Sequence, residues 1–149
     1  MLGELAFTSE DYQRAHVISE INNAAWVLAG SYFLTGEDNS DKTVKIRRPF
    51  HPAQDSWGAL EIKARYGGIW VNKDAFISLA NSTTSAQRAD DISLGLNWHL
   101  NQHIKWMLDY EQTDFNGGSA TGDREDERAM LPRLQLSYET WRIIRHAEE

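Results

Sequence analysis

The sequence contains no cysteine, only three prolines and no long apolar run. Without cysteine, disulfide frameworks, thiolate metal sites and cysteine nucleophiles are all excluded. No apolar run approaches the roughly 18 residues that a membrane-spanning helix requires. The stretch from Met1 to Arg14 lacks the basic segment and apolar core of a signal peptide. The secondary structure of the chain therefore has to be inferred from the alternation of apolar and polar residues.

Charge and aromatic content limit the class of protein further. The formal net charge of −7 and the pI near 5.2 argue against a nucleic-acid surface, and 149 residues suit one ordinary domain. The mean hydropathy of −0.56 does not exclude a membrane. A transmembrane β-barrel turns only every second residue towards lipid, and it concentrates tryptophan and tyrosine at the bilayer interfaces. Six tryptophans and five tyrosines are therefore suggestive.

The clearest pattern is an alternation between Asp91 and Tyr110. Apolar residues occupy the even positions from Ile92 to Leu100 and again from Ile104 to Tyr110, with Met107 as the exception. A period of two predicts two strands, and the short interval between them predicts a tight turn.

The parity of the apolar positions predicts the register of this hairpin. A one-residue slip would exchange the faces, so paired residue numbers must sum to an even value. The predicted pairs are Leu100 with Ile104, Trp98 with Trp106, Leu96 with Leu108 and Leu94 with Tyr110. Asn101, Gln102 and His103 then form the turn, and we expect His103 to adopt a positive φ, as the last residue of such loops commonly does. One face is apolar, and the other carries polar pairs such as His99 with Lys105.

The same reasoning predicts an all-β antiparallel meander of about six long strands. The other predicted strands are Glu4–Tyr12, Asn23–Thr35, Trp57–Tyr66 and Met130–Tyr138. Asn23–Thr35 is rich in alanine, so a helix is an alternative there. The predicted polar connections are 13–22, Gly36–Ser56, Val71–Ala89 and Asn116–Arg128. Long strands, one very tight turn and long polar loops are typical of a transmembrane barrel.

Several stretches resemble a known family. WGALEIKARYGGIWVN, RADDISLGLNWHLNQHIKWMLDYEQTDF and LPRLQLSY resemble the C-terminal part of the phosphate-selective porin O and P family of outer-membrane porins. AWVLAGSYFLTGE is similar to the preceding strand of that family, and LGLNW-LN is the most specific segment.

The resemblance implies a passive channel in the bacterial outer membrane. Such a porin is usually a homotrimer of barrels with about sixteen strands, so this chain would lack a signal peptide and about ten N-terminal strands. Residues 1–138 would be the C-terminal portion of the barrel, because these porins end on the aromatic residue of the last strand, here Tyr138; residues 139–149 would be an atypical tail. The implied partners are outer-membrane lipid and small anionic solutes such as phosphate or polyphosphate, with no cofactor and no enzymatic activity.

The overlong connection from Gly36 to Ser56 is the candidate for anion selectivity. If the chain ends on the periplasmic side, this connection and the Asn101–His103 turn are periplasmic, where connections are normally short. We therefore expect it to fold into the lumen and attract anions, since rings of Arg and Lys suit anion pores. A solvated loop without function is the alternative. The candidate residues are Lys42, Lys45, Arg47 and Arg48.

Alternation also assigns the two faces of the sheet. The predicted lumen wall comprises Lys63, Arg65, Lys105, Arg133, Asp109 and Glu111, beside Glu61 and Asp91. The predicted lipid-facing surface and aromatic girdle comprise Trp57, Leu94, Leu96, Trp98, Trp106, Leu108 and Tyr110. The family's main anion-binding residues would lie on strands outside this chain.

Other activities have little support. The sequence has no Gly-rich phosphate loop, no nucleophile elbow and no carboxylate pair in an obvious apolar pocket. His99 and His103 flank the turn, but Asp91 and Asp109 are expected well up the wall from them, so no metal site is predicted. A different reading is a small soluble or surface β-barrel that binds an apolar ligand, with its aromatic faces pointing inward.

Overall fold

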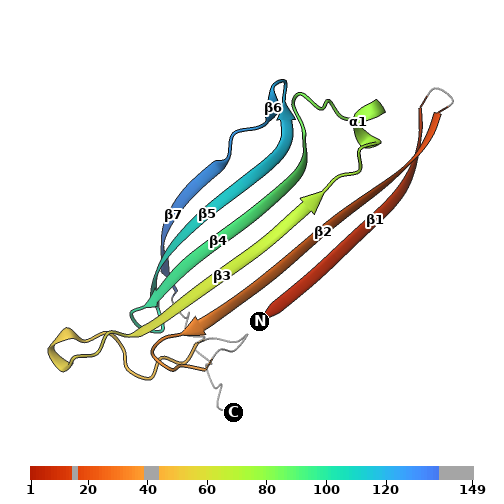
Figure 1. Cartoon of the computed structure of the whole chain (residues 1–149). Helices are drawn as coiled ribbons and strands as arrows, with labels where there is room; N and C mark the ends of the chain where they lie inside the picture. Colours follow the sequence, from red (N-terminus) through yellow and green to blue (C-terminus); the bar gives the residue numbers. More distant parts are fainter. Residues whose placement is uncertain (15–16, 39–43, 138–149) are drawn as a thin grey trace, which may run out of the picture.

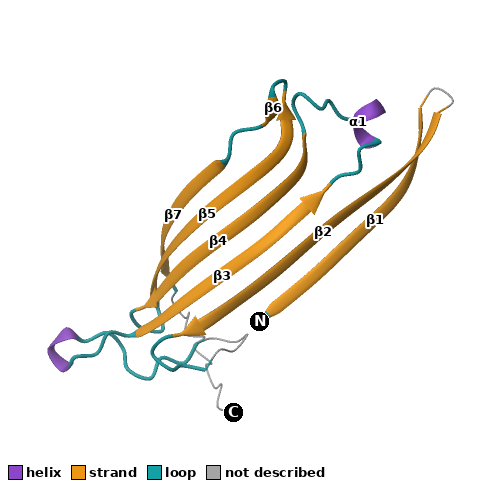
Figure 2. Cartoon of the chain, viewed as in Figure 1, coloured by secondary structure: helices purple, strands orange, loops and turns teal. Residues whose placement is uncertain are grey.

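The computed structural model describes residues 1–14, 17–38 and 44–137. They form a curved antiparallel sheet with very little helix (Figures 1 and 2). No helix in these ranges is long and apolar enough to cross a membrane. The strands are β1 (Leu2–Arg14), β2 (Val17–Phe33), β3 (Ala59–Trp70), β4 (Ala86–His99), β5 (Ile104–Ser119), β6 (Gly122–Asp123) and β7 (Glu127–Leu136). The helical turns are η1 (Pro52–Gln54) and α1 (Ala75–Ser78).

The sheet is a meander in which sequential neighbours pair. β1 to β5 pair in chain order, the short β6 pairs antiparallel with the end of β5, and β7 pairs with β5. The predicted all-β meander of about six long strands is confirmed. We name the two ends of the sheet by their connections. The turn end carries the Asn101–His103 turn and the β2–β3 connection, and the loop end carries α1 and β6 (Figure 1).

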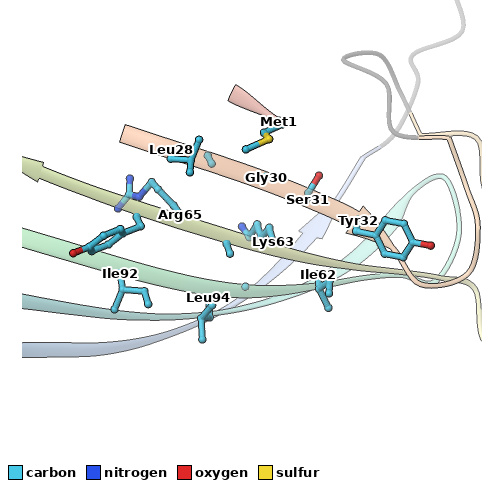
Figure 3. Close-up of a pocket in the computed structure, with 14 residues that line it drawn as sticks. Met1, Leu28, Gly30, Ser31, Tyr32, Ile62, Lys63, Arg65, Ile92 and Leu94 are labelled. Atoms are coloured by element: carbon cyan, nitrogen blue, oxygen red, sulfur yellow. The ribbon is translucent and has the colours of Figure 1, made fainter. Parts of the chain in front are cut away.

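The predicted register of the central hairpin is also confirmed. Trp98 lies opposite Trp106, and Leu96 lies opposite Leu108. The same even parity continues into β3 and β7, where Leu60 faces Trp98 and Leu134 faces Trp106. In β3, β4, β5 and β7 the even-numbered residues therefore share one face, called here the apolar face, and the odd-numbered residues share the polar face. Figure 3 shows Lys63 and Arg65 on one side of the sheet, with Ile62, Ile92 and Leu94 on the other.

β1 reaches the same arrangement with its numbering shifted by one. Its apolar residues Leu5 and Phe7 are odd-numbered, and they pair with the even-numbered Trp26 and Ala24 of β2. Two residues separate the paired Arg14 and Val17, so the numbers of paired residues in this hairpin add to an odd value. The apolar face therefore continues without a break from β7 to β1.

The predicted strands were too short at the loop end. Residues 17–22 belong to β2, the predicted loop Val71–Ala89 already becomes strand at Ala86, and β5 extends to Ser119. Asn23–Thr35 is strand as far as Phe33, not helix. At the loop end polar residues such as Glu20 and Asn22 occupy the face that is apolar elsewhere, so the period-two signal disappears while the backbone ladder continues. Cross-strand polar contacts replace the apolar pairs there, as in the hydrogen bond from Ser9 Oγ to Glu20 Oε1 at 3.1 Å.

The expected positive φ at His103 is wrong. Among the described residues other than glycine, only Asp55 has a positive φ, at 50°. The side chain of Asn101 closes the turn instead, because its Oδ1 accepts hydrogen bonds from the backbone N–H groups of His103 at 2.8 Å and Ile104 at 2.9 Å. An asparagine that mimics a backbone turn in this way removes the need for a left-handed residue.

This arrangement makes the turn sensitive to Asn101. We expect Asn101→Ala to lower the free energy of unfolding by about 1–2 kcal/mol, because two backbone donors lose their acceptor. Urea unfolding of the protein in lipid vesicles, followed by tryptophan fluorescence, measures the change. Gln102→Ala, at the exposed tip of the same turn, is the matched control. Equal stability of the two variants would contradict a structural role for the Asn101 amide.

Candidate functional site

The polar face carries a network of ion pairs that runs across the strands. Lys63 Nζ lies 2.8 Å from Asp109 Oδ1, although β4 separates their strands, and Arg133 Nη2 approaches Asp109 Oδ2 at 3.4 Å. Arg65 Nη2 lies 2.8 Å from Asp91 Oδ1 and 3.8 Å from Glu111 Oε1. Three of the four predicted wall cations are thus paired with carboxylates on other strands. The fourth, Lys105, lies opposite His99 on the same face.

A second polar group occupies the turn end of this face. Asn97 Nδ2 donates to Glu61 Oε2 at 2.7 Å, and His99 Nε2 lies 3.6 Å from the same oxygen. Asn97 and His99 are only 6% and 8% exposed, so these contacts are largely shielded from water. Glu37 is also buried, and its carboxylate interacts electrostatically with His99. We call Glu37, Glu61, Asn97 and His99 the rim cluster.

The rim cluster draws the start of the β2–β3 connection onto the polar face. Thr35 Oγ1 accepts a hydrogen bond from the N–H of Leu60 at 3.0 Å and donates to the Glu37 carboxylate. Gly36, with φ of 81°, turns the chain between them. Glu37 is therefore directed towards His99, which lies on the polar face.

The basic part of this connection lies close by. Lys45, Arg47 and Arg48 are exposed, and Arg47 lies against Gly36, with its Nη1 3.7 Å from where a Cβ would stand on that glycine. The Oγ of Ser56 donates to the carbonyls of Arg48 and Pro49, which fixes the end of the basic segment. Lys42, the remaining predicted anion-attracting residue, lies outside the described residues.

From Phe50 onwards the connection lies on the other side of the sheet end. The Phe50 ring packs edge-on against Trp98 at a centroid distance of 5.3 Å and lies 6.0 Å from Trp57. The N–H of Phe50 donates to the carbonyl of Leu100, and the Trp98 indole N–H donates to the carbonyl of Trp57. Trp98 belongs to the apolar face, so the expectation that this connection enters the lumen does not hold for Phe50.

In the part of the chain that the structure describes, the apolar face is continuous, and beyond the contact of Phe50 with Trp98 it is largely exposed. Leu94, Leu96, Trp106 and Leu108 are between 39% and 51% exposed, which is unusual for large apolar side chains in a sheet. Its rings gather at two levels. Phe50, Trp57, Trp98 and Trp106 lie at the turn end, and nearer the loop end Trp26 and Tyr66 meet edge-to-face at 4.9 Å.

A hollow of about 680 Å³ lies beside the start of β1, over β2, β3 and β4 (Figure 3). Leu28, Tyr32 and Ile62 are among the residues that line it, and all three are exposed by more than 40%. The hollow is therefore an open depression and not an enclosed ligand cavity.

Burial distinguishes the two faces further. Met107 and Asp109, on the polar face of β5, are 6% and 8% exposed, whereas Trp106 and Leu108, which precede them and lie on the apolar face, are 49% and 42% exposed. Side chains converge on the concave side of a curved sheet and diverge on the convex side. The difference is therefore expected of a sheet whose polar face is concave, as it is in the wall of a water-filled barrel.

Two features therefore characterise this sheet: a charged concave face, and an apolar convex face with aromatic residues at two levels. A family comparison agrees with them, since "Phosphate-selective porin O and P" matches residues 2–138. The chain belongs to this porin family. A search of curated proteins found no match.

Membership of a porin family places the chain among outer-membrane channel proteins, which are not an enzyme family. All six predicted wall residues of this porin chain lie on the polar face, and the predicted lipid-facing residues of β4 and β5 lie on the apolar face. Trp57 lies just before β3, beside Trp98. Tyr138 and residues 139–149, the predicted strand end and tail, lie outside the described residues.

The histidines of the porin chain are engaged separately. His99 belongs to the rim cluster, whereas His103 Nδ1 lies 3.1 Å from the carbonyl oxygen of Ser137. Asp91 and Asp109 are occupied by Arg65 and Lys63. Across residues 1–14, 17–38 and 44–137, no three histidine or carboxylate side chains are placed to hold a metal ion.

Sequence reasoning missed the rim cluster and the packing of Phe50. Alternation assigns Glu61, Asn97 and His99 to one face, so their proximity was open to prediction once the β3–β4 register was fixed. Glu37 and Phe50 lie in a connection without periodicity, where no pattern indicates which face a side chain contacts. The one feature of the sequence that could have indicated this packing is Phe50 itself. An aromatic residue between charged and proline-rich neighbours is expected to pack against an apolar surface.

The contrast between the faces gives a matched pair of substitutions. We expect Leu94→Arg to reduce folding into lipid vesicles by about 2–4 kcal/mol, because a charge on the lipid side must enter hydrocarbon. Ser93→Arg is the control, since it lies at the same depth on the polar face, opposite the carboxylate of Glu111. The yield of protease-resistant protein after vesicle insertion provides the readout. If both variants insert equally well, the apolar face does not meet lipid.

Proposed function

We propose that this chain forms part of the wall of an outer-membrane diffusion channel for small hydrophilic solutes, with a preference for anions such as phosphate or polyphosphate. The observation that carries the proposal is that the two faces of a single sheet have opposite character. One face is charged and concave, and the other is apolar and exposed. Such a sheet separates water from lipid and requires no chemistry from its side chains.

The wall itself contributes little to the preference for anions. Lys63, Arg65 and Arg133 are each within 4 Å of a carboxylate, so their fields are largely cancelled. The exposed cations of the β2–β3 connection are better placed to act on a solute. Lys45, Arg47 and Arg48 are exposed at the turn end, and Arg47 lies near the Gly36 turn that leads into the rim cluster. We propose that they attract anions at this mouth, together with Lys42.

A soluble barrel that binds an apolar ligand would need the opposite arrangement. Its apolar residues would converge and be shielded, while the polar residues faced water. Here Met107 is the buried exception on a polar face, whereas Leu94 and Trp106 are about half exposed. The apolar hollow beside β1 is open as well. The porin family match points in the same direction.

Charge reversal tests the role of the connection. We expect Lys45→Glu, Arg47→Glu and Arg48→Glu, combined in one variant, to shift the reversal potential in a KCl gradient away from the chloride equilibrium potential. The reason is that exposed charges at a pore mouth attract ions of the opposite sign. Planar-bilayer recording of the reconstituted protein measures the shift, and phosphate block of the chloride current reports on oxyanion binding.

Lys73→Glu provides the control, because Lys73 is an exposed cation at the loop end. It should leave the reversal potential much closer to that of the wild type. Anion preference that survives the triple reversal would show that these three residues do not set selectivity. Absence of any conductance from the wild-type protein would contradict the channel function itself.

We also propose that the channel is a homotrimer. Size-exclusion chromatography with light scattering in detergent should give the mass of a trimer, which dissociates on heating, as expected of separate barrels packed through their convex faces. A folded, conducting species with the mass of a monomer would argue against this assembly.

A further inference from the structure

Gly95 lies at the centre of the ion-pair network on the polar face. It is opposite Lys63 on β3 and opposite Asp109 on β5, so the three residues form one row across the sheet. Both neighbours in the row are charged, and Gly95 has no side chain to separate them.

The Lys63 side chain uses this space. A Cβ on Gly95 would stand 2.2 Å from Lys63 Cε, 2.7 Å from Lys63 Cγ and 2.4 Å from Asp109 Oδ1. Real Cβ atoms do not approach other atoms so closely. The lysine therefore crosses directly over the β4 backbone, and this path allows its Nζ to reach Asp109 at 2.8 Å.

Any other residue at position 95 would obstruct that path. The obstructing atoms belong to flexible side chains and not to backbone, so the sheet can keep its register while Lys63 moves. Asp109 would retain Arg133, which approaches from β7 at 3.4 Å. Lys63 would lose its carboxylate, and Glu61, the nearest acid on its own strand, is already bonded to Asn97.

We propose that Gly95 is a selectivity-determining position of the channel: it holds the Lys63 ammonium against the wall, where Asp109 neutralises it, and so keeps a free cation out of the lumen. This inference rests on the proposed channel function. It adds a role for a residue that carries no charge itself.

Gly95→Ala is the direct test. The net charge of the wall stays the same, but the Lys63 ammonium moves away from Asp109 into the lumen, so the reversal potential in a KCl gradient should shift towards that of chloride. Asp109→Asn should shift it further in the same direction, because it removes the carboxylate shared by Lys63 and Arg133.

Two controls isolate the lysine. In a Lys63→Gln background, Gly95→Ala should cause no further shift. Gly30→Ala tests the effect of replacing a strand glycine as such, because Gly30 has no atoms within 4 Å of an added Cβ. A wild-type reversal potential in Gly95→Ala, or a shift that persists without Lys63, would overturn the proposal.

A second readout does not depend on conduction. Acetylation of folded protein in detergent, quantified at Lys63 by mass spectrometry, should be faster by up to about fivefold in Gly95→Ala, the free-energy scale of a partly exposed ion pair. Faster acetylation in a protein that conducts no ions would support the role of Gly95 in placing Lys63 while contradicting the channel. Unchanged acetylation would contradict the role of Gly95 whatever the conductance.

Discussion

The structure depends on one constraint: every strand must keep its apolar residues on the same face as its neighbours. Side chains alternate along a strand, so a shift of one residue in any pairing would exchange the faces of all later strands. From β2 to β7 the long strands pair in even register, and β1 compensates for its odd-numbered apolar residues with an odd register. The lengths of the connections are secondary to this requirement. The closing hydrogen bonds of Asn101 show how one side chain can fix a turn of the required length.

Constant register has a further consequence for the polar face. It aligns side chains of three or more strands in rows, so that a charge on β3 can meet a partner on β5 as well as one on the adjacent strand β4. Lys63 and Asp109 are joined in this way across Gly95, and Arg65 reaches Glu111 across the row of Ser93. Such pairs neutralise the charge of the wall but keep its surface polar. Cancellation within the wall moves the source of any selectivity to the connection at the turn end, whose cations are exposed.

The sequence predicted most where one face is apolar and the other polar. There, the strands, the register of Trp98 with Trp106 and the composition of both faces followed from parity alone. Prediction failed at the loop end, because polar residues such as Glu20 and Asn22 occupy the face that is apolar elsewhere and so interrupt the period. It also failed in the Gly36–Ser56 connection. The electrostatic interaction of Glu37 with His99 and the contact of Phe50 with Trp98 depend on three-dimensional proximity that no spacing encodes. The network around Gly95 was predictable in part. Its members share a predicted face, but the path of the Lys63 side chain over Gly95 is visible only in the three-dimensional structure.

The two outer edges of the sheet impose a second condition, which concerns backbone hydrogen bonds and not side chains. Among the described strands, β1 and β7 each pair on one side only, so a row of backbone N–H and C=O groups is unpaired along each outer edge. In water such groups can form hydrogen bonds with solvent. In hydrocarbon they cannot, and each unsatisfied group then costs roughly several kcal/mol of desolvation free energy. An apolar face can therefore enter lipid only if both edges meet further strands. The same reasoning that assigns the convex face to the membrane thus requires strand partners at β1 and β7, and it makes edge pairing, more than side-chain packing, the condition for insertion.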